Sequence, residues 1–275
     1  FAWFNNYNEA FGIPARLIGF IVLFIAFAIK VPIVPFHTWL PDAHVEAPTP
    51  ISIILAGILL KIGGYGIIRV CVSIFPDIVA YSNWWLGLIG VISILYGDFN
   101  ALEQRDLKRM IAYSSVSHMG FVLLGIASLT VEGISGGLFQ MISHGFLSAA
   151  LFFLVGILYE RVHDRNIYNF RGLATLMPKY TGFVAVAFFA ALGLPGFSAF
   201  IAEAFVIIGA FNSASVGTGL PRWMAIGGSV GILLSAAYFL WTLQRMFFGQ
   251  TRLKGGEEWA TALEGDISWR ERIIL

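Results

Sequence analysis

Residues 51–75 read ISIILAGILLKIGGYGIIRVCVSIF, an apolar run with one lysine, Lys61, near its middle and one arginine, Arg69, toward its end. About 20 consecutive apolar residues are enough for a helix to cross the roughly 30 Å hydrocarbon core of a bilayer. A cation at the centre of such a run would lie at membrane depth, where charged groups are costly and rare. The stretch therefore predicts a membrane-spanning helix with a buried lysine.

Similar runs recur along the whole chain, which has 275 residues, 58% of them hydrophobic and 12% charged. Soluble domains carry about 25% charged residues. We predict an all-α, polytopic membrane helix bundle in residues 1–249, followed by a polar connector in residues 250–275 that leads to a further helix outside this sequence. The single cysteine, Cys71, cannot form an internal disulfide. About seven spans are expected, at roughly 15–36, 51–75, 84–100, 110–129, 138–159, 181–212 and 224–248.

Basic residues in the loops predict the orientation, because cytoplasmic loops carry an excess of lysine and arginine. If seven spans alternate, the loops after spans three, five and seven share one side. These loops hold most of the basic residues: Arg105, Lys108 and Arg109; Arg161, Arg165, Arg171 and Lys179; and Arg252, Lys254, Arg270 and Arg272. We predict that this side faces the cytoplasm, or the matrix or stroma of an organelle.

Two spans carry a break. In the first, Lys30 is followed by Pro32, and the sixth is interrupted by the sequence GLPG, which contains Pro195 and Gly196. Proline removes a helix hydrogen bond, and in lipid the freed backbone groups must find other partners. Broken helices at membrane depth often line an ion path. Because the breaks lie five spans apart, they suggest inverted five-helix repeats, although two ordinary proline kinks would give the same pattern.

Five ionisable residues inside the spans are candidates for proton transfer, since buried charges in membrane proteins are usually functional. They are Lys30, Lys61, His118, His144 and Glu203. A desolvated lysine can release its proton near neutral pH, whereas arginine cannot, and imidazole can accept a proton on one nitrogen while it donates from the other. The structural alternatives are a Lys30 that reaches the head groups, neutral hydrogen-bonded histidines, and a Glu203 in an ion pair.

Other polar residues predict less. We interpret Asp98 and Glu103 as charges at the boundary of the third span. The loop of residues 39–48, WLPDAHVEAP, holds two acids and a histidine but has no standard metal-ligand spacing, so no metal site is predicted. No phosphate-binding glycine loop, CxxC or haem motif is present, so no redox cofactor or nucleotide site is predicted in this chain.

Three long motifs resemble one family, the antiporter-like subunits of respiratory complex I. The motifs are residues 30–49, KVPIVPFHTWLPDAHVEAPT; residues 55–66, LAGILLKIGGYG; and residues 105–120, RDLKRMIAYSSVSHMG. The LPG of residues 194–196 and the following Glu203 are also similar to this family. The resemblance covers nearly the whole chain, and the first two motifs favour the subunit M, or chain 4, type over the L and N types.

The resemblance implies a role for each candidate. Lys30 would be the broken-helix lysine of the first repeat, and Lys61 would link two half-channels. His118 and His144 would lie on a central polar axis, and Glu203 would be the broken-helix residue of the second repeat. It also implies that the chain is a fragment, because the glutamate partner of Lys30 would lie on a helix before this sequence begins.

As a function, the resemblance implies a proton-translocating subunit of NADH–quinone oxidoreductase in the bacterial inner membrane. NADH, FMN, Fe–S clusters and quinone would belong to partner subunits, and the neighbours would be other membrane subunits, especially antiporter-like ones. The scattered positive charge gives no surface for nucleic acid. The alternatives are an Mrp-type cation/proton antiporter subunit, a membrane subunit of an energy-converting hydrogenase, a photosynthetic NDH chain 4, and a purely structural membrane subunit, which the five buried titratable residues disfavour.

Overall fold

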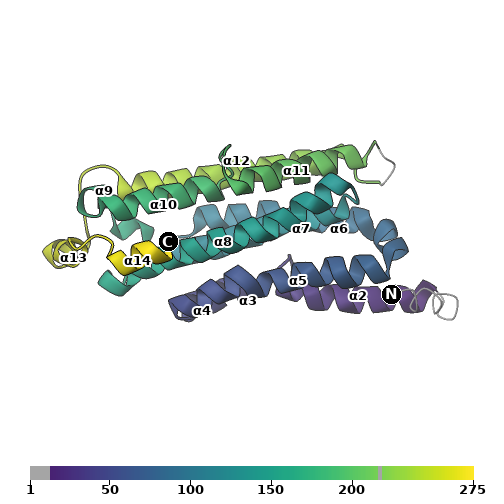
Figure 1. Ribbon diagram of the computed structural model, residues 1–275, viewed down its shortest axis with the longest axis horizontal. Coiled ribbons are helices and arrows are strands. Elements are labelled where there is room, and N and C mark those ends of the chain that lie inside the picture. Colours follow the sequence, from purple (N-terminus) through teal and green to yellow (C-terminus); the bar gives the residue numbers. More distant parts are fainter. Residues whose placement is uncertain (1–12, 216–218) are drawn as a thin grey trace.

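The computed structural model describes residues 13–215 and 219–275, in which helices run side by side along the long axis of the molecule (Figure 1). No β-strand occurs among these residues, apart from a single bridge between Asp106 and Asn166. The all-α membrane fold is therefore confirmed. Five helices are long and apolar enough to cross a membrane by length and composition: Thr49–Val72, Pro76–Glu103, Leu107–Ala127, Val131–Val162 and Arg222–Phe247.

The first broken pass consists of α2 (Ile13–Lys30) and α3 (Trp39–Glu46). The predicted break after Lys30 is present, but the prediction of a loop over residues 39–48 was wrong. Pro41 lies in the first turn of α3, where a missing N–H costs no helix hydrogen bond. Within the break, the backbone N–H of Val34 donates to Ser93 Oγ at 3.1 Å, so a side chain from another helix satisfies a backbone donor that the break leaves free.

The next pass is continuous but irregular, since two π-helical segments interrupt it. Its parts are α4 (Thr49–Ile54), η1 (Leu55–Leu59), α5 (Leu60–Gly66) and η2 (Ile67–Val72). π-helical turns are rare in proteins as a whole, and those that occur are often at functional sites. Glycines let α5 approach its neighbours closely: a Cβ on Gly63 would lie 2.7 Å from the Val31 side chain, and one on Gly64 would collide with Met141.

Three long helices form the centre of the bundle: α6 (Pro76–Glu103), α7 (Leu107–Ala127) and α8 (Val131–Val162). The α7 helix is buried along nearly its whole length, so its polar side chains lie inside the protein. The Asp106 side chain caps its first turn by accepting from the backbone N–H groups of Lys108 and Arg109, at 2.7 and 3.2 Å. The Thr130 hydroxyl caps α8 in the same way.

The second broken pass and the last long helix complete the bundle. After η3 (Ile167–Asn169) and α9 (Leu173–Leu176), the chain forms α10 (Pro178–Ala191), α11 (Ser198–Ser213) and α12 (Arg222–Phe247). The break between α10 and α11 is confirmed. It contains Gly193 and Gly196 with φ of +74° and +105°, a conformation that side chains other than glycine rarely adopt.

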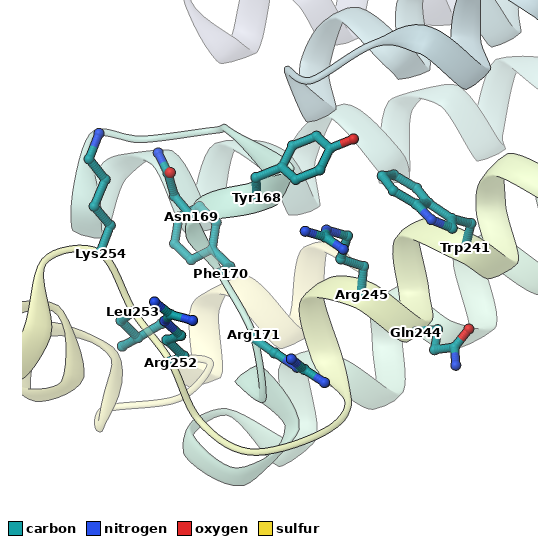
Figure 2. Close-up of a pocket in the computed structure, with 10 residues that line it drawn as sticks. All are labelled: Tyr168, Asn169, Phe170, Arg171, Trp241, Gln244, Arg245, Arg252, Leu253 and Lys254. Carbon is teal, nitrogen blue, oxygen red and sulfur yellow. The ribbon is translucent and has the colours of Figure 1, made fainter.

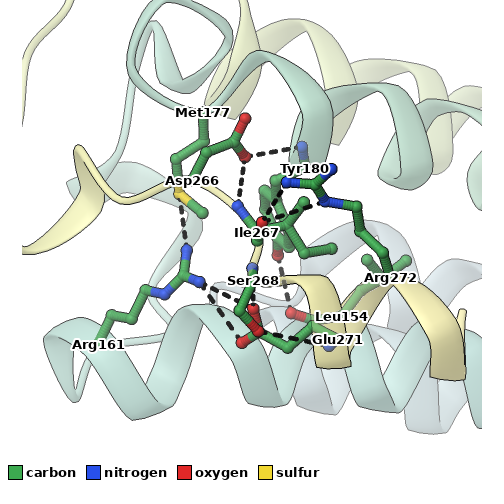
Figure 3. Close-up of polar contacts among 9 residues, drawn as sticks. All are labelled: Leu154, Arg161, Met177, Tyr180, Asp266, Ile267, Ser268, Glu271 and Arg272. Carbon is green, nitrogen blue, oxygen red and sulfur yellow. Dashed lines mark hydrogen bonds and ion pairs between the residues drawn. The ribbon is translucent and has the colours of Figure 1, made fainter.

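The predicted connector after α12 contains two short helices, α13 (Gly256–Leu263) and α14 (Trp269–Ile274). The carboxylate of Asp266 accepts from the backbone N–H groups of Lys179 and Tyr180, both at 3.0 Å, and so caps α10. Glu271 accepts from Arg161 on α8 at 3.1 Å (Figure 3). These contacts attach the connector to the bundle.

The three basic loops meet at one end of the molecule, as the alternation of seven passes predicts. Leu107 N–H donates to the Arg165 carbonyl at 3.0 Å, and Arg252 N–H donates to the Arg171 carbonyl at 3.1 Å. Figure 1 shows α9 and α13 gathered at this end. We call it the basic end.

Candidate functional site

Lys61 and His144 form the closest contact between two of the predicted residues. Lys61 lies on α5 and His144 on α8, and Lys61 Nζ is 2.6 Å from His144 Nδ1. The same Nζ donates to the Ala56 carbonyl in η1. The His144 side chain is buried, while Lys61 is half-buried beside a groove of about 750 Å³ lined otherwise by apolar side chains, glycines and Tyr65. The lysine ammonium is therefore held by two acceptors inside the bundle.

The hydrogen bond made by the second ring nitrogen of His144 shows which ring nitrogen carries the hydrogen. His144 Nε2 is 3.1 Å from Ser115 Oγ on α7, and that hydroxyl donates to the Ile111 carbonyl at 3.2 Å. Because the hydroxyl proton is used in this bond, Oγ accepts from His144 Nε2–H. Nδ1 of the neutral ring is then the acceptor for Lys61, so a proton can pass directly from the lysine to the imidazole.

His118 connects α7 to the second broken helix. Its Nε2 is 3.2 Å from the carbonyl oxygen of Ala191, the last residue of α10, and 3.7 Å from Glu203 Oε1. A carbonyl can only accept, so Nε2 carries a hydrogen. The break thus leaves a carbonyl that a side chain from another helix satisfies. The rings of His118 and His144 lie 5.2 Å apart, centroid to centroid.

Glu203 lies on α11 and is 1% exposed. Its carboxylate is directed at the break: a Cβ on Gly193 would lie 2.5 Å from Glu203 Oε2, so glycine makes room for the acid. Gln140 of α8 also faces the carboxylate. Lys61, His144, His118 and Glu203 therefore follow one another across four helices, and we call these four residues the buried series.

Asp98 was misread from the sequence. It is fully buried on α6 rather than at a boundary, and Ser117 of α7 and Tyr238 of α12 face its carboxyl group. Gly97 lets α6 and α7 approach closely, because a Cβ there would lie 2.6 Å from the Ser117 backbone nitrogen. The sequence offered one signal: Asp98 follows an apolar run without a basic neighbour. Ser115 was also missed, although its spacing of three residues from His118 places both on one helix face.

Lys30 is not brought to the buried series. It ends α2 and is exposed, and in the described part of the chain no hydrogen bond or ion pair joins it to the other four candidates. Its Cβ packs against α5, where a Cβ on Gly63 would lie 2.9 Å away. The first break therefore sits beside the helix of Lys61. Pro32, with φ of +29°, lies in this break, and Pro195 and Gly196 lie in the second.

Two polar residues of the 39–48 segment, Asp42 and His44, contact other helices. Asp42 accepts from Arg109 at 2.6 Å, and His44 stacks on Phe152 with ring centroids 4.3 Å apart. Among residues 13–215 and 219–275, no group of three histidine, cysteine, aspartate or glutamate side chains is placed to hold a metal ion.

A helix bundle with two broken helices and a buried series of titratable side chains is typical of one class of protein, the membrane transport proteins built on broken helices. The comparisons with known proteins identify the family within this class. The chain belongs to the NADH:quinone oxidoreductase/Mrp antiporter transmembrane family, whose model matches residues 2–235. This confirms the resemblance seen in the sequence motifs.

Two curated relatives are subunit M of NADH-quinone oxidoreductase from Rickettsia bellii and chain 4 of NAD(P)H-quinone oxidoreductase from a Synechococcus species. Each is 44% identical to this chain, over 90% and 88% of its length. The chain spans about half the length of these relatives, 48% and 46%.

Two solved structures share the fold. Respiratory complex I from Thermus thermophilus matches 96% of this chain and 55% of its own chain, with a TM-score of 0.81 and 32% identity. The Mrp complex from a Dietzia species matches 85% of this chain and 42% of its own, with a TM-score of 0.77 and 27% identity.

Proposed function

We propose that this chain is part of a proton-translocating membrane subunit of an NADH–quinone oxidoreductase, of the subunit M or chain 4 type, and that the buried series carries the protons. The observation that carries the proposal is the 2.6 Å contact between Lys61 Nζ and His144 Nδ1, at the start of a row of titratable groups that ends in a broken helix. Curated relatives at 44% identity are oxidoreductase subunits of these two types.

The first step of the proposed relay is a transfer from the Lys61 ammonium to His144 Nδ1, which leaves a neutral amine and an imidazolium. The next is transfer to His118. Both histidines line a cavity of about 10 Å³, together with Ser114 and Ser148, and this cavity is large enough for about one water molecule. His118 then exchanges with Glu203, whose carboxylate oxygen is 3.7 Å away.

Lys30 would act on this relay as a charge. The break that follows it packs against α5, which carries Lys61. A second positive charge on a helix packed against α5 would favour release of a proton by Lys61 through repulsion of like charges. A change in a neighbouring subunit would separate Lys30 from the glutamate that precedes this sequence. Lys30 would then either release its proton toward Lys61 or repel the charge of Lys61.

The assembly follows from the same proposal. NADH, FMN, Fe–S clusters and quinone would be bound by partner subunits, and the neighbours of this chain would be other antiporter-like membrane subunits. The chain would lie in the bacterial inner membrane with its basic end toward the cytoplasm, because basic loops are retained on that side.

A second candidate is a subunit of an Mrp-type antiporter or of a related respiratory membrane complex. It is supported by the similarity to the Dietzia Mrp complex and to an archaeal membrane-bound sulfane sulfur reductase, which is 25% identical with a TM-score of 0.75. Identity to the oxidoreductase subunits is higher, and we therefore prefer the first proposal.

Substitution of Lys61 in the complete complex, assayed in inverted membrane vesicles, tests the proposal. We expect Lys61→Met to lower the number of protons moved per NADH oxidised several-fold while the complex still assembles. Lys61→Arg should fail as well, because arginine keeps the charge but does not release its proton. Lys179→Met is the matched control, since this exposed lysine at the start of α10 is remote from the series.

Normal pumping by either Lys61 variant would show that the relay does not pass through this lysine. Pumping that needs Na⁺ rather than NADH would support the antiporter alternative instead.

A further inference from the structure

A cavity of about 650 Å³ opens at the basic end, outside the buried series. It lies between the last turns of α12 and two chain segments, residues 168–171 and 252–254 (Figure 2). Four cations line it: Arg171, Arg245, Arg252 and Lys254. No carboxylate is among its lining residues. We call it the basic cavity.

None of these four cations is paired with a carboxylate in the described part of the chain. The arginine–carboxylate pairs there are formed by other residues, Arg16, Arg109, Arg161 and Arg165. Four positive charges around one cavity repel one another, and an anion between them would relieve that repulsion. Guanidinium groups bind phosphate through two parallel hydrogen bonds, which makes arginine well suited to this anion.

The cavity wall is held in place by contacts that do not use up the charges. The Arg245 guanidinium lies over the Tyr168 ring at 4.4 Å and 5.7 Å from the Trp241 ring, and Figure 2 shows it between these two side chains. The two segments pair through their backbones, with Arg252 N–H donating to Arg171 O and Lys254 N–H donating to Asn169 O, both at 3.1 Å. The cations are therefore presented by a fixed frame.

The neighbouring surface indicates where the anion comes from. An exposed apolar stripe runs along α12 through Ile226, Val230, Leu233 and Leu240, which are 60%, 41%, 72% and 45% exposed. The steps of four, three and seven residues keep these side chains on one helix face. The next position on this face is Gln244, which lines the cavity. Tryptophan and tyrosine beside the cavity are typical of the membrane–water interface.

We propose that the basic cavity binds the phosphate headgroup of an anionic phospholipid from the leaflet at the basic end, and that the acyl chains of this lipid lie on the α12 stripe. Basic pockets at the cytoplasmic side of membrane helices suit such headgroups. Four cations match a lipid with two phosphates better than one with a single phosphate. The proposal does not depend on proton transfer, because no residue of the buried series lines this cavity.

The test uses the complete complex in nanodiscs of phosphatidylcholine, titrated with phosphatidylglycerol or with diphosphatidylglycerol, with bound lipid counted by native mass spectrometry. The double variant Arg245→Gln with Arg252→Gln should weaken binding of the anionic lipid about thirtyfold, since each basic residue near an anionic surface contributes roughly fivefold. Arg222→Gln is the matched control, because Arg222 lies over Phe211 at the opposite end of α12. We expect the control to bind as the unsubstituted complex does.

Equal lipid binding by the double variant and the control would overturn the proposal. Displacement of the lipid by inorganic phosphate alone would also overturn it, in favour of a soluble phosphate-bearing anion. Loss of a partner subunit on a native gel, with lipid binding unchanged, would show instead that a protein fills the cavity.

Discussion

Replacing Gly193 by alanine tests whether the second break positions the glutamate of the buried series. Two effects follow from the structure. The residue has φ of +74°, and a non-glycine residue in the left-handed region costs about 1–2 kcal/mol. In addition, the new Cβ would lie 2.5 Å from Glu203 Oε2, whereas carbon–oxygen contacts are normally about 3.3 Å or longer.

The carboxylate must therefore retreat by roughly 0.8 Å. Such a shift is large beside the 3.7 Å that separates Glu203 Oε1 from His118 Nε2. Misplacing a reacting group by about 1 Å can cost roughly 100-fold in rate. We expect the variant to assemble, but its rate of proton movement should fall at least about tenfold relative to its rate of NADH oxidation.

Two other glycines separate strain from displacement. Gly196→Ala meets backbone strain at least as large, at φ of +105°, but a Cβ there has no neighbour within 4 Å. Gly182→Ala, inside α10, has neither the strain nor a neighbour. Proton movement would be measured in vesicles beside electron transfer and assembly for all three variants. If Gly193→Ala pumps as well as Gly196→Ala, the position of Glu203 is not what the break controls, and the reasoning is wrong.

Two further outcomes are expected. Ser115→Ala leaves the buried His144 Nε2–H without its acceptor, which costs about 1–3 kcal/mol, so pumping and thermal stability should fall. Ser143→Ala also breaks a hydrogen bond, but one to Ser198 and not to the buried series, so pumping should stay unchanged. Equal loss of pumping in both variants would contradict this. Asp266→Ala removes the acceptor of the first N–H groups of α10, at a cost of about 1–2 kcal/mol, and trypsin should cleave the connector faster in the assembled complex. Asp266→Asn should be intermediate because its amide oxygen still accepts, and unchanged cleavage in both variants would show that the cap does not hold the connector.

The passes through the membrane could be predicted from the sequence because the length of each apolar run shows whether a helix can cross the bilayer. The breaks were predictable because proline and glycine act locally on the backbone. The ends of elements were harder. Residues 39–48 look like a loop because of their prolines, but Pro41 falls in a first turn that tolerates it. The π-helical turns beside Lys61 leave no mark in composition.

The members of the candidate site could be selected from the sequence, but their contacts could not. Lys61, His118, His144 and Glu203 stand out because charge is rare inside apolar runs. Their order in space depends on how four helices pack, which periodicity does not encode. Asp98 shows the limit most clearly: its burial follows from the close approach of α6 and α7 at Gly97, a contact that no local pattern reveals.

The bond from His118 to the end of α10 has a mechanical consequence. Nε2 carries a hydrogen both in the neutral tautomer that this bond selects and in the imidazolium, so the Ala191 carbonyl keeps its donor in either charge state. In the proposed relay, a proton arriving from His144 would be accepted at Nδ1, and the proton passed to Glu203 would leave from Nε2, which lies 3.7 Å from the carboxylate. The end of α10 therefore keeps this hydrogen bond while His118 is neutral in this tautomer or protonated, and would lose it only when the Nε2 proton moves to Glu203.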